Sequence, residues 1–427
     1  MRIALFTTFV VLTAFFSSQS KSQSVLPSNS SEGNNSLSKF DTGKLNSVNR
    51  FMSEAVQKQA VVGSSALVIQ DGEQVFFNAW GYQDREKQIP ITRNTIFRIY
   101  SMTKPVTSVA AMQLVEQGKM SLDDPVDRYL SDFRALTIYQ ADGRKGQGED
   151  SHQKMTIRDL LRHTSGFTYG FFDESHPIDQ IYMQGQFVDT SKDLQELVQK
   201  LSAVPLKHPP GTRFEYSVST DVLARVIEVV SGQRFDRYLT ENILSPLRMD
   251  DTSFVVPKEK RDRLATMYSD DGLGELIVSP EVVSSKFVDD SLLFFSGGGG
   301  LCSTIDDYAS FARMLMNKGV SDRGQRILKA ETLQQMFTDQ LVGIAKPSRE
   351  GMNKDAPWGQ EGFSFGLGFS ISQTKRGKDY TWNGIAGTQF WVNPESGTII
   401  LYMVQVFPLI GHDLAGEVRR LVYEAMK

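Results

Sequence analysis

The chain has 427 residues, of which 40% are hydrophobic and 22% are charged, and its formal net charge is −4 at pH 7. This length is about two to three times that of a typical domain and allows a sizeable core. The composition is that of an ordinary globular protein, which excludes a disordered, collagen-like or coiled-coil chain. A slightly acidic balance without a basic block argues against nucleic acid as a partner.

The first 24 residues have the pattern of a secretory signal peptide. Arg2 is followed by an apolar run over residues 3–16 and then by small and polar residues up to Ser24. The run is shorter than the ~20 residues that span a bilayer, so we expect no stable membrane span after removal of the signal. Residues 25–42 are rich in Ser and Asn and predict a disordered linker. We therefore expect a periplasmic or secreted protein whose folded domain covers residues 43–427.

The first elements of that domain are a hairpin and a long helix. Ser64–Ile69 and Gln74–Trp80 are apolar-rich and flank Asp71-Gly72, which is a strong signal for a hairpin turn. Apolar residues then recur at helical spacing over Ser101–Gln117, and Gly118 supplies the stop.

Short helices and then strands follow along the chain. Four helical patterns lie in the region of roughly 120–290: Ile157–Leu161, Leu194–Leu201, Asp221–Val230 and Phe235–Ile243. Three strands and a closing helix are then expected, at Gly366–Ser372, Gln389–Val392, Thr398–Val406 and Leu414–Ala425. This order predicts an α+β fold in which an antiparallel sheet is flanked by terminal helices and joined to a mostly helical lobe at roughly 120–290.

One candidate reaction centre is the G-x-S-x-G sequence around Ser364, which fits the nucleophile elbow of α/β-hydrolases. Asp379 and His412 follow it in the required order. That elbow needs a helix after the serine, whereas the residues after Ser364 alternate like a strand. Only 63 residues remain beyond Ser364, so we interpret this match as fortuitous.

Metal chemistry is not indicated by the sequence. The five histidines are scattered and form no H-E-x-x-H or i, i+4 pair: His152, His163, His176, His208 and His412. Cys302 is the single cysteine, so it cannot form an intramolecular disulfide, and we expect a buried packing residue rather than a reactive thiol. Neither a metal nor a cofactor is expected.

The third candidate is Ser101-Met102-Thr103-Lys104, an S-x-x-K sequence. The bare pattern is weak, because it occurs five times, beginning at Ser18, Ser36, Ser101, Ser151 and Ser372. Ser101 alone opens a long apolar helix, where three-residue spacing puts Ser101 and Lys104 on one face. The helix N-terminus also favours a developing negative charge. A capping Ser with an exposed Lys is the structural alternative.

Neighbouring segments of the sequence favour a catalytic Ser–Lys pair over a capping Ser with an exposed Lys. With Ser101, five blocks in order resemble the serine β-lactamase and penicillin-binding superfamily, and within it the class C β-lactamase-like branch and the family VIII carboxylesterases. These blocks are Phe97–Tyr100 leading into the S-x-x-K helix, Ile157–Gly166, Pro210–Ser217, Ser296–Thr304 and Trp382–Thr388. The resemblance implies a β-lactamase/transpeptidase-like fold from about Ser47 to the C-terminus.

The resemblance also implies a role for each matching residue. Ser101 would be the acylated nucleophile, Lys104 would help to deprotonate it, and Tyr216 would share the proton transfer. The backbone N–H groups of Ser101 and Ile385 would form the oxyanion hole, and Trp382 and Gly384 would form the wall beside it. The block around His163 is expected to support the helical lobe rather than to take part in the chemistry.

Two departures from the family pattern bear on the substrate. Val218 stands where the second motif commonly carries Asn, and Trp382 stands where the third motif commonly begins with a carboxylate-binding Lys. An aromatic in place of a cation favours an uncharged substrate. We therefore expect a small-molecule carboxylic ester as substrate, with a β-lactamase or D,D-peptidase, an acyltransferase, or a non-catalytic binding module as alternatives. The sequence leaves the oligomeric state open.

The region between Phe167 and Lys200 is rich in aromatic residues. They are Phe167, Tyr169, Phe171, Phe172, Tyr182 and Phe187. These rings either form a flap over the site or pack the lobe without contacting a substrate.

Overall fold

A computed structural model describes residues 39–140, 154–280, 285–346, 362–407 and 413–427. The expected signal peptide and most of the expected linker lie outside these residues. The helices are α2 (Thr42–Gln57), α3 (Thr103–Glu116), α4 (Ile157–Leu161), α5 (Pro177–Gly185), α6 (Phe187–Thr190), α7 (Leu194–Ser202), α8 (Ser219–Ser231), α9 (Phe235–Leu239), α10 (Ile305–Met316), α11 (Ala330–Met336) and α12 (Leu414–Ala425). The strands are β1 (Gly63–Gln70), β2 (Glu73–Asp84), β3 (Ile89–Pro90), β4 (Phe97–Arg98), β5 (Tyr268–Asp270), β6 (Leu276–Val278), β7 (Cys302–Ser303), β8 (Ser364–Phe365), β9 (Ser370–Thr374), β10 (Gly377–Asn383), β11 (Gln389–Asn393) and β12 (Thr398–Val404).

Within the described residues, the main sheet has eight antiparallel strands in the order β3-β2-β1-β12-β11-β10-β9-β8. Strands from the two ends of the chain meet at the β1–β12 pair, where Leu67 lies opposite Leu401. The β1–β2 hairpin turns at Asp71 and Gly72, whose φ angles are 50° and 85°. Two positive φ angles suit the right-handed twist of the flanking strands, so the Asp-Gly signal is confirmed.

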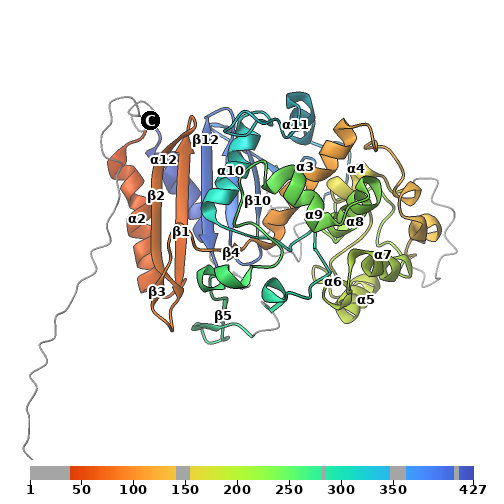
Figure 1. Ribbon diagram of the computed structural model, residues 1–427, viewed down its shortest axis with the longest axis horizontal. Coiled ribbons are helices and arrows are strands. Elements are labelled where there is room, and N and C mark those ends of the chain that lie inside the picture. Colours follow the sequence, from red (N-terminus) through yellow and green to blue (C-terminus); the bar gives the residue numbers. More distant parts are fainter. Residues whose placement is uncertain (1–38, 141–153, 281–284, 347–361, 408–412) are drawn as a thin grey trace, which may run out of the picture.

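Helices cover both faces of the sheet, and therefore every residue of β1 and β12 is buried. On one face, Ala66 and Val68 join a core with α2 and α12, while Leu67 and Ile69 on the other face join the core shared with the helical lobe. This alternation follows from the two-residue period of a strand. Figure 1 shows α2 and α12 together at one end of the molecule and α4–α9 at the other.

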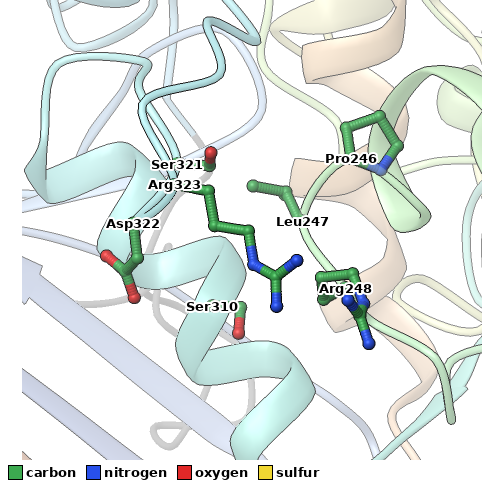
Figure 2. Close-up of a pocket in the computed structure, with 7 residues that line it drawn as sticks. All are labelled: Pro246, Leu247, Arg248, Ser310, Ser321, Asp322 and Arg323. Carbon is green, nitrogen blue, oxygen red and sulfur yellow. The ribbon is translucent and has the colours of Figure 1, made fainter.

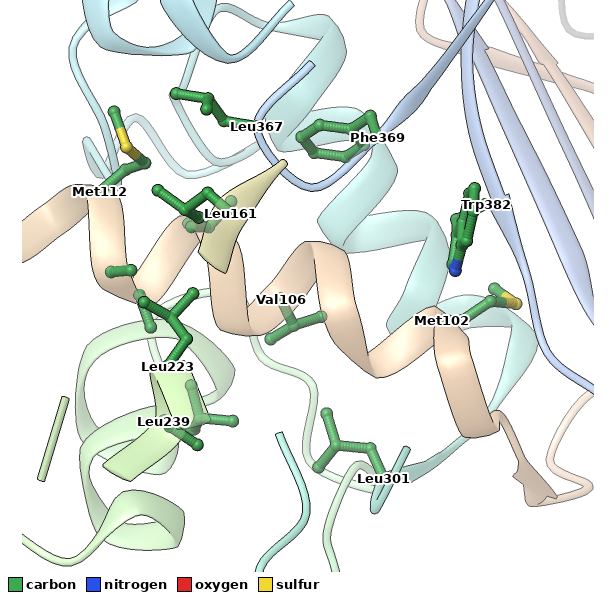
Figure 3. Close-up of a cluster of buried hydrophobic side chains, with 14 of the residues drawn as sticks. Met102, Val106, Met112, Leu161, Leu223, Leu239, Leu301, Leu367, Phe369 and Trp382 are labelled. Carbon is green, nitrogen blue, oxygen red and sulfur yellow. The ribbon is translucent and has the colours of Figure 1, made fainter. Parts of the chain in front are cut away.

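Helix α3 is the central element between the sheet and the lobe. Its residues from Thr103 to Leu114 are all buried. Figure 3 shows Met102, Val106 and Met112 directed to different sides of this region, among leucines of the lobe and aromatic rings of the sheet side. A helix that is buried all round is fixed in position by its neighbours, so the residues at its N-terminus are held firmly.

Most elements agree with the sequence-based expectations, and α4 and α12 have the expected bounds. Three differences stand out. Ser101 lies in a 3₁₀ turn, Tyr100–Met102, that precedes α3 instead of opening the α-helix. Helix α9 ends at Leu239 and continues as a π-helical turn, Thr240–Leu244. Strand β9 begins at Ser370, because Gly366 and Leu367 bond to Phe369 and Met336 outside the ladder. None of the helices in the described ranges is long and apolar enough to cross a bilayer.

Asp307 is a buried acid whose titration affects the stability of this fold. It lies in the first turn of α10, is 8% exposed, and accepts hydrogen bonds from Thr252 Oγ1 and the Asp251 N–H, both at 2.8 Å. Burial raises the pKa of Asp307 from 3.8 to about 6, and the hydrogen bonds only partly oppose this. Its contribution to stability is therefore fully present below about pH 4 and is lost as the pH rises through 6.

We predict that Asp307→Asn gains stability relative to wild type as the pH rises. A pKa difference of about 2 units corresponds to about 3 kcal/mol, so the difference in unfolding free energy between variant and wild type should grow by up to that amount from pH 4 to pH 7. Urea denaturation at pH 4, 5.5 and 7 measures it. The exposed Asp132→Asn is the control and should follow wild type. A difference that stays constant with pH would contradict the prediction.

Candidate active site

Ser101 and Lys104 lie together where α3 begins. Ser101 is half-buried, whereas the Lys104 side chain is 1% exposed. The Lys104 Nζ lies 3.2 Å from Ser101 Oγ and donates a hydrogen bond to it. The preceding residue, Tyr100, has a φ of 41°, a left-handed conformation that bulky residues rarely adopt. Strained backbone of this kind is concentrated at functional sites.

Tyr216 joins this pair from a separate segment, the loop before α8. Its hydroxyl donates to Ser101 Oγ at 2.8 Å, and its ring centroid lies 4.6 Å from the Lys104 Nζ. Trp382 Nε1 donates to the Tyr216 hydroxyl at 3.4 Å. The structure thus brings the three expected catalytic residues into direct contact, with Trp382 beside them.

The end of β10 forms one wall of the site. Trp382 is 2% exposed, and its ring packs edge-on against Phe365. A Cβ at Gly384 would lie only 2.5 Å from the Ile99 carbonyl oxygen, so the glycine allows the strand end to approach the chain just before Ser101. Ile385 follows directly and its side chain is 41% exposed.

Two further partners of Lys104 were not expected from the sequence. Its Nζ donates to the Gly298 carbonyl at 2.7 Å and to the Tyr169 hydroxyl at 3.0 Å. A Cβ at Gly298 would lie 2.5 Å from Asp221 Oδ2 and 2.9 Å from the Tyr169 hydroxyl. The run of four glycines at positions 297–300 was the available signal, because such a run permits close backbone approach.

Two side chains around Lys104, His163 and Tyr169, have strongly shifted pKa values. Burial, and next the charge of Lys104, lower the pKa of His163 well below its usual value. Burial raises the pKa of Tyr169 well above 10, and the charge of Asp221 adds to this. His163 is therefore neutral and Tyr169 is a phenol near pH 7. The His163 ring packs 4.9 Å from the Tyr216 ring, so the block that contains His163 supports Tyr216 as well as the lobe.

A buried ion cluster ties the segments of Tyr169 and Tyr216 together. Lys207, with its side chain 5% exposed, lies 2.5 Å from Asp179 Oδ2 and 2.8 Å from Glu215 Oε1. Asp179 accepts a hydrogen bond from Thr168, which precedes Tyr169, and Glu215 precedes Tyr216. One cation thus fixes both tyrosine-bearing segments relative to each other.

The aromatic region after Phe167 divides into two groups. Phe167 and Tyr182 are core residues, at 1% and 4% exposure. Tyr169, Phe171 and Phe172 instead form a row of rings with centroid distances of 5.5 and 4.4 Å, and Phe172 lies 6.0 Å from Tyr216. Phe171 is 51% exposed, so this row presents an apolar surface next to the site.

Ser364 has no surroundings suited to a nucleophile. It lies in strand β8 and is followed by strand β9, so the strand–turn–helix of a nucleophile elbow is missing from this part of the described chain. Asp379 is engaged elsewhere, by Asn393 at 2.8 Å and Arg419 at 2.7 Å. His412, like His152, lies outside the described residues.

No group of three or more His, Cys, Asp or Glu side chains within the described ranges is placed to hold a metal ion. Cys302 is fully buried, and burial raises the pKa of its thiol to about 12, which confirms a packing residue. A small cavity of about 120 Å³ lies apart from the Ser101 site and is lined by Pro246, Leu247, Arg248, Ser310, Ser321, Asp322 and Arg323. Figure 2 shows Arg248 and Arg323 among the side chains that line this cavity.

The sequence and the fold are similar to those of several known proteins. Esterase EstB of Burkholderia gladioli is 31% identical over 60% of this chain and 65% of its own. An uncharacterised protein of Mycobacterium tuberculosis is 33% identical over 83% of this chain and 88% of its own length. The structure of EstCE1, a hydrolase with promiscuous acyltransferase activity, covers 89% of this chain and 99% of its own, with a TM-score of 0.71 and 26% identity. The Beta-lactamase family model matches residues 48–423. The chain therefore belongs to the Beta-lactamase family, whose members are typically serine hydrolases, and the expected α+β, β-lactamase/transpeptidase-like fold is confirmed.

Proposed function

We propose that this protein is an exported serine hydrolase that cleaves carboxylic esters through an acyl-enzyme on Ser101. One observation carries the proposal: Ser101 Oγ accepts hydrogen bonds from both Lys104 Nζ, at 3.2 Å, and the Tyr216 hydroxyl, at 2.8 Å. Whichever of the two groups is unprotonated, as an amine or a phenolate, accepts the serine's proton during the attack, while the other donates a hydrogen bond. Export is supported by the leader-like residues 1–24.

The proposed reaction has two halves. Ser101 Oγ bonds to the ester carbonyl carbon while its proton passes to the Lys104–Tyr216 pair. The backbone N–H groups of Ser101 and Ile385 stabilise the oxyanion. When the intermediate collapses, the C–O bond to the alcohol breaks and the pair returns the proton to the departing alcohol. Water then attacks the acyl-enzyme in the same way, which releases the acid and restores Ser101.

An uncharged ester fits the surroundings of Ser101. Trp382 occupies the position where the family commonly has a carboxylate-binding Lys, and its indole N–H is directed to Tyr216. Phe171 and Ile385 place half-exposed apolar side chains at the site. Such a surface favours an apolar acyl or alcohol group over a carboxylated peptide or β-lactam.

Acyl transfer to an alcohol is a second candidate function. The same acyl-enzyme would form, and an alcohol instead of water would clear it. The structural neighbour EstCE1 is a hydrolase with promiscuous acyltransferase activity. The exposed Phe171 and the partly buried Phe172 beside it would hold an apolar alcohol better than water.

We predict that Ser101→Ala lowers the hydrolysis of p-nitrophenyl butyrate by at least about 1,000-fold, because the variant cannot form the acyl-enzyme. A fluorophosphonate should label wild type and not this variant. Nitrocefin should be a much poorer substrate than the ester for wild type.

Ser364→Ala is the matched control. Its buried hydroxyl has no hydrogen-bond partner among the described atoms, so this variant should retain wild-type activity. Loss of activity with Ser364→Ala alone would overturn the site assignment. A wild-type protein that neither hydrolyses the ester nor reacts with the fluorophosphonate would instead support a non-catalytic binding module, and preference for nitrocefin would support a β-lactamase.

Gly384→Ala tests the oxyanion wall. Its Cβ would lie 2.5 Å from the Ile99 carbonyl oxygen, which forces the end of β10, and Ile385 with it, away from Ser101. We expect kcat to fall by about 100-fold, the typical effect of losing one oxyanion donor, with KM changed much less. Gly43→Ala, in α2, is the control, since its Cβ would meet only the Asp41 side chain at 3.3 Å. An unchanged kcat for Gly384→Ala would remove Ile385 from the proposed mechanism.

The ratio of new ester to acid formed from the acyl-enzyme distinguishes acyl transfer from hydrolysis. We predict that adding an apolar primary alcohol at constant p-nitrophenyl butyrate yields a new ester, detected by mass spectrometry, while p-nitrophenol release is unchanged or faster. Phe171→Ala should lower the ratio of transfer to hydrolysis, because it removes apolar surface from the acceptor side. Formation of butyric acid alone at every alcohol concentration would exclude the acyltransferase.

A further inference from the structure

A buried carboxylate that the proposed reaction does not use lies behind Lys104. Asp221 is in the first turn of α8 and is 1% exposed. Its Oδ1 accepts hydrogen bonds from Ser296 Oγ at 2.5 Å and from the Gly298 N–H at 3.0 Å. Its Oδ2 has no hydrogen-bond partner among the described atoms. Keeping a half-satisfied carboxylate in the interior is costly, which calls for a compensating charge.

One peptide group connects Asp221 to Lys104. The Gly298 N–H binds Asp221, while the carbonyl of the same residue accepts from Lys104 Nζ at 2.7 Å. A Cβ at Gly298 would contact both Asp221 Oδ2 and the Tyr169 hydroxyl, so both atoms pack closely against this glycine. Tyr169 also accepts a hydrogen bond from Lys104. Asp221 thus anchors the backbone that holds the lysine.

Few charged side chains surround Asp221 and Lys104. Lys104 faces Ser101 on its own turn, Tyr169 and Tyr216 from two loops, and neutral His163. No carboxylate of the described residues forms an ion pair with Lys104 within 4 Å, whereas several surface lysines do have such partners. The charge of Lys286 also acts on Asp221, but Lys286 is paired with Asp189 at 3.3 Å. Burial raises the pKa of Asp221, and among the charges that oppose this Lys104 has the largest effect.

We infer that Asp221 is a positioning residue for the catalytic lysine: it holds Lys104 against Ser101 through the Gly298 peptide. The inference rests on the proposed acylation of Ser101. It has a direct consequence for pH dependence. A neutral residue at position 221 removes a buried negative charge from behind Lys104, so we expect the active pH range to move down.

The test compares Asp221→Asn with wild type over pH 5–10. The amide has the shape of the carboxylate and can still accept from Ser296 and Gly298, so it removes chiefly the charge. We expect kcat/KM at pH 7 to change by about 10-fold or more, and both limbs of the pH profile to move down by about one unit, the usual effect of a nearby charge. Asp221→Ser, a smaller neutral residue, should give the same shift if Asp221→Asn folds poorly.

Asp307→Asn is the matched control, because Asp307 is also a buried acid in the first turn of a helix but lies among Thr252 and Asp251. Its activity profile should follow wild type. If Asp221→Asn loses activity but neither limb of its kcat/KM–pH profile moves, Asp221 has only a structural role. If the whole profile is the same as that of wild type, the inference is overturned.

The rate of fluorophosphonate labelling at Ser101, measured over the same pH range, separates this inference from the proposed function. If wild type is labelled but hydrolyses no ester, the proposed function fails, and the labelling profiles of wild type and Asp221→Asn still decide the role of Asp221. If wild type is not labelled at any pH, Ser101 is not activated and both proposals fail.

Discussion

The burial of Lys104 is the constraint on which the site depends. An amino group removed from water needs polar partners, because an unsolvated one is strongly unfavourable. Its partners are Ser101 Oγ, the Tyr169 hydroxyl, the Gly298 carbonyl and the ring face of Tyr216. They come from four parts of the chain. The start of α3, the segment of Tyr169, the glycine run and the loop before α8 must therefore all be in place before this one side chain is stabilised. The site is therefore a product of the whole fold, even though Ser101, the proposed nucleophile, and Lys104 are three residues apart.

Local signals in the sequence identified the parts of the fold that are locally determined. The Asp71-Gly72 turn needs two positive φ angles that these residues tolerate, and α4 begins at a capping box formed by Thr156 and Asp159. The S-x-x-K spacing likewise pointed to Lys104 beside Ser101. Tyr169, however, is 65 residues from Lys104 and Gly298 is 194 residues from it. Contacts over such separations depend on tertiary packing, and spacing along one sequence cannot reveal them. Tyr216 and Trp382 were expected only through the family resemblance.

Two elements differ from the sequence-based expectations, each for a different reason. Helix α2 is absent from the elements expected above, although its buried Leu45, Val48, Met52 and Ala55 recur at helical spacing after the N-cap Asp41. The sequence pattern therefore does predict a helix at the start of the domain. The 3₁₀ turn at Ser101 is a different case. Tyr100 adopts a positive φ while its ring packs 5.4 Å from Phe287 and 5.6 Å from Phe407, so distant rings help to hold the conformation just before the nucleophile.

Trp382 shows that several residues together determine which substrate would fit this site. Its indole is 2% exposed, packs on Phe365 and Tyr216, and donates to the Tyr216 hydroxyl. A lysine at this position would leave part of that volume empty and would add a second ammonium close to Lys104 in a desolvated region. The two like charges would each favour the neutral form of the other. Replacing Trp382 by a carboxylate-binding lysine would therefore change both the packing against Phe365 and the electrostatics around Lys104. The aromatic wall, the buried lysine and the proposed preference for an uncharged substrate are in this sense one coupled arrangement.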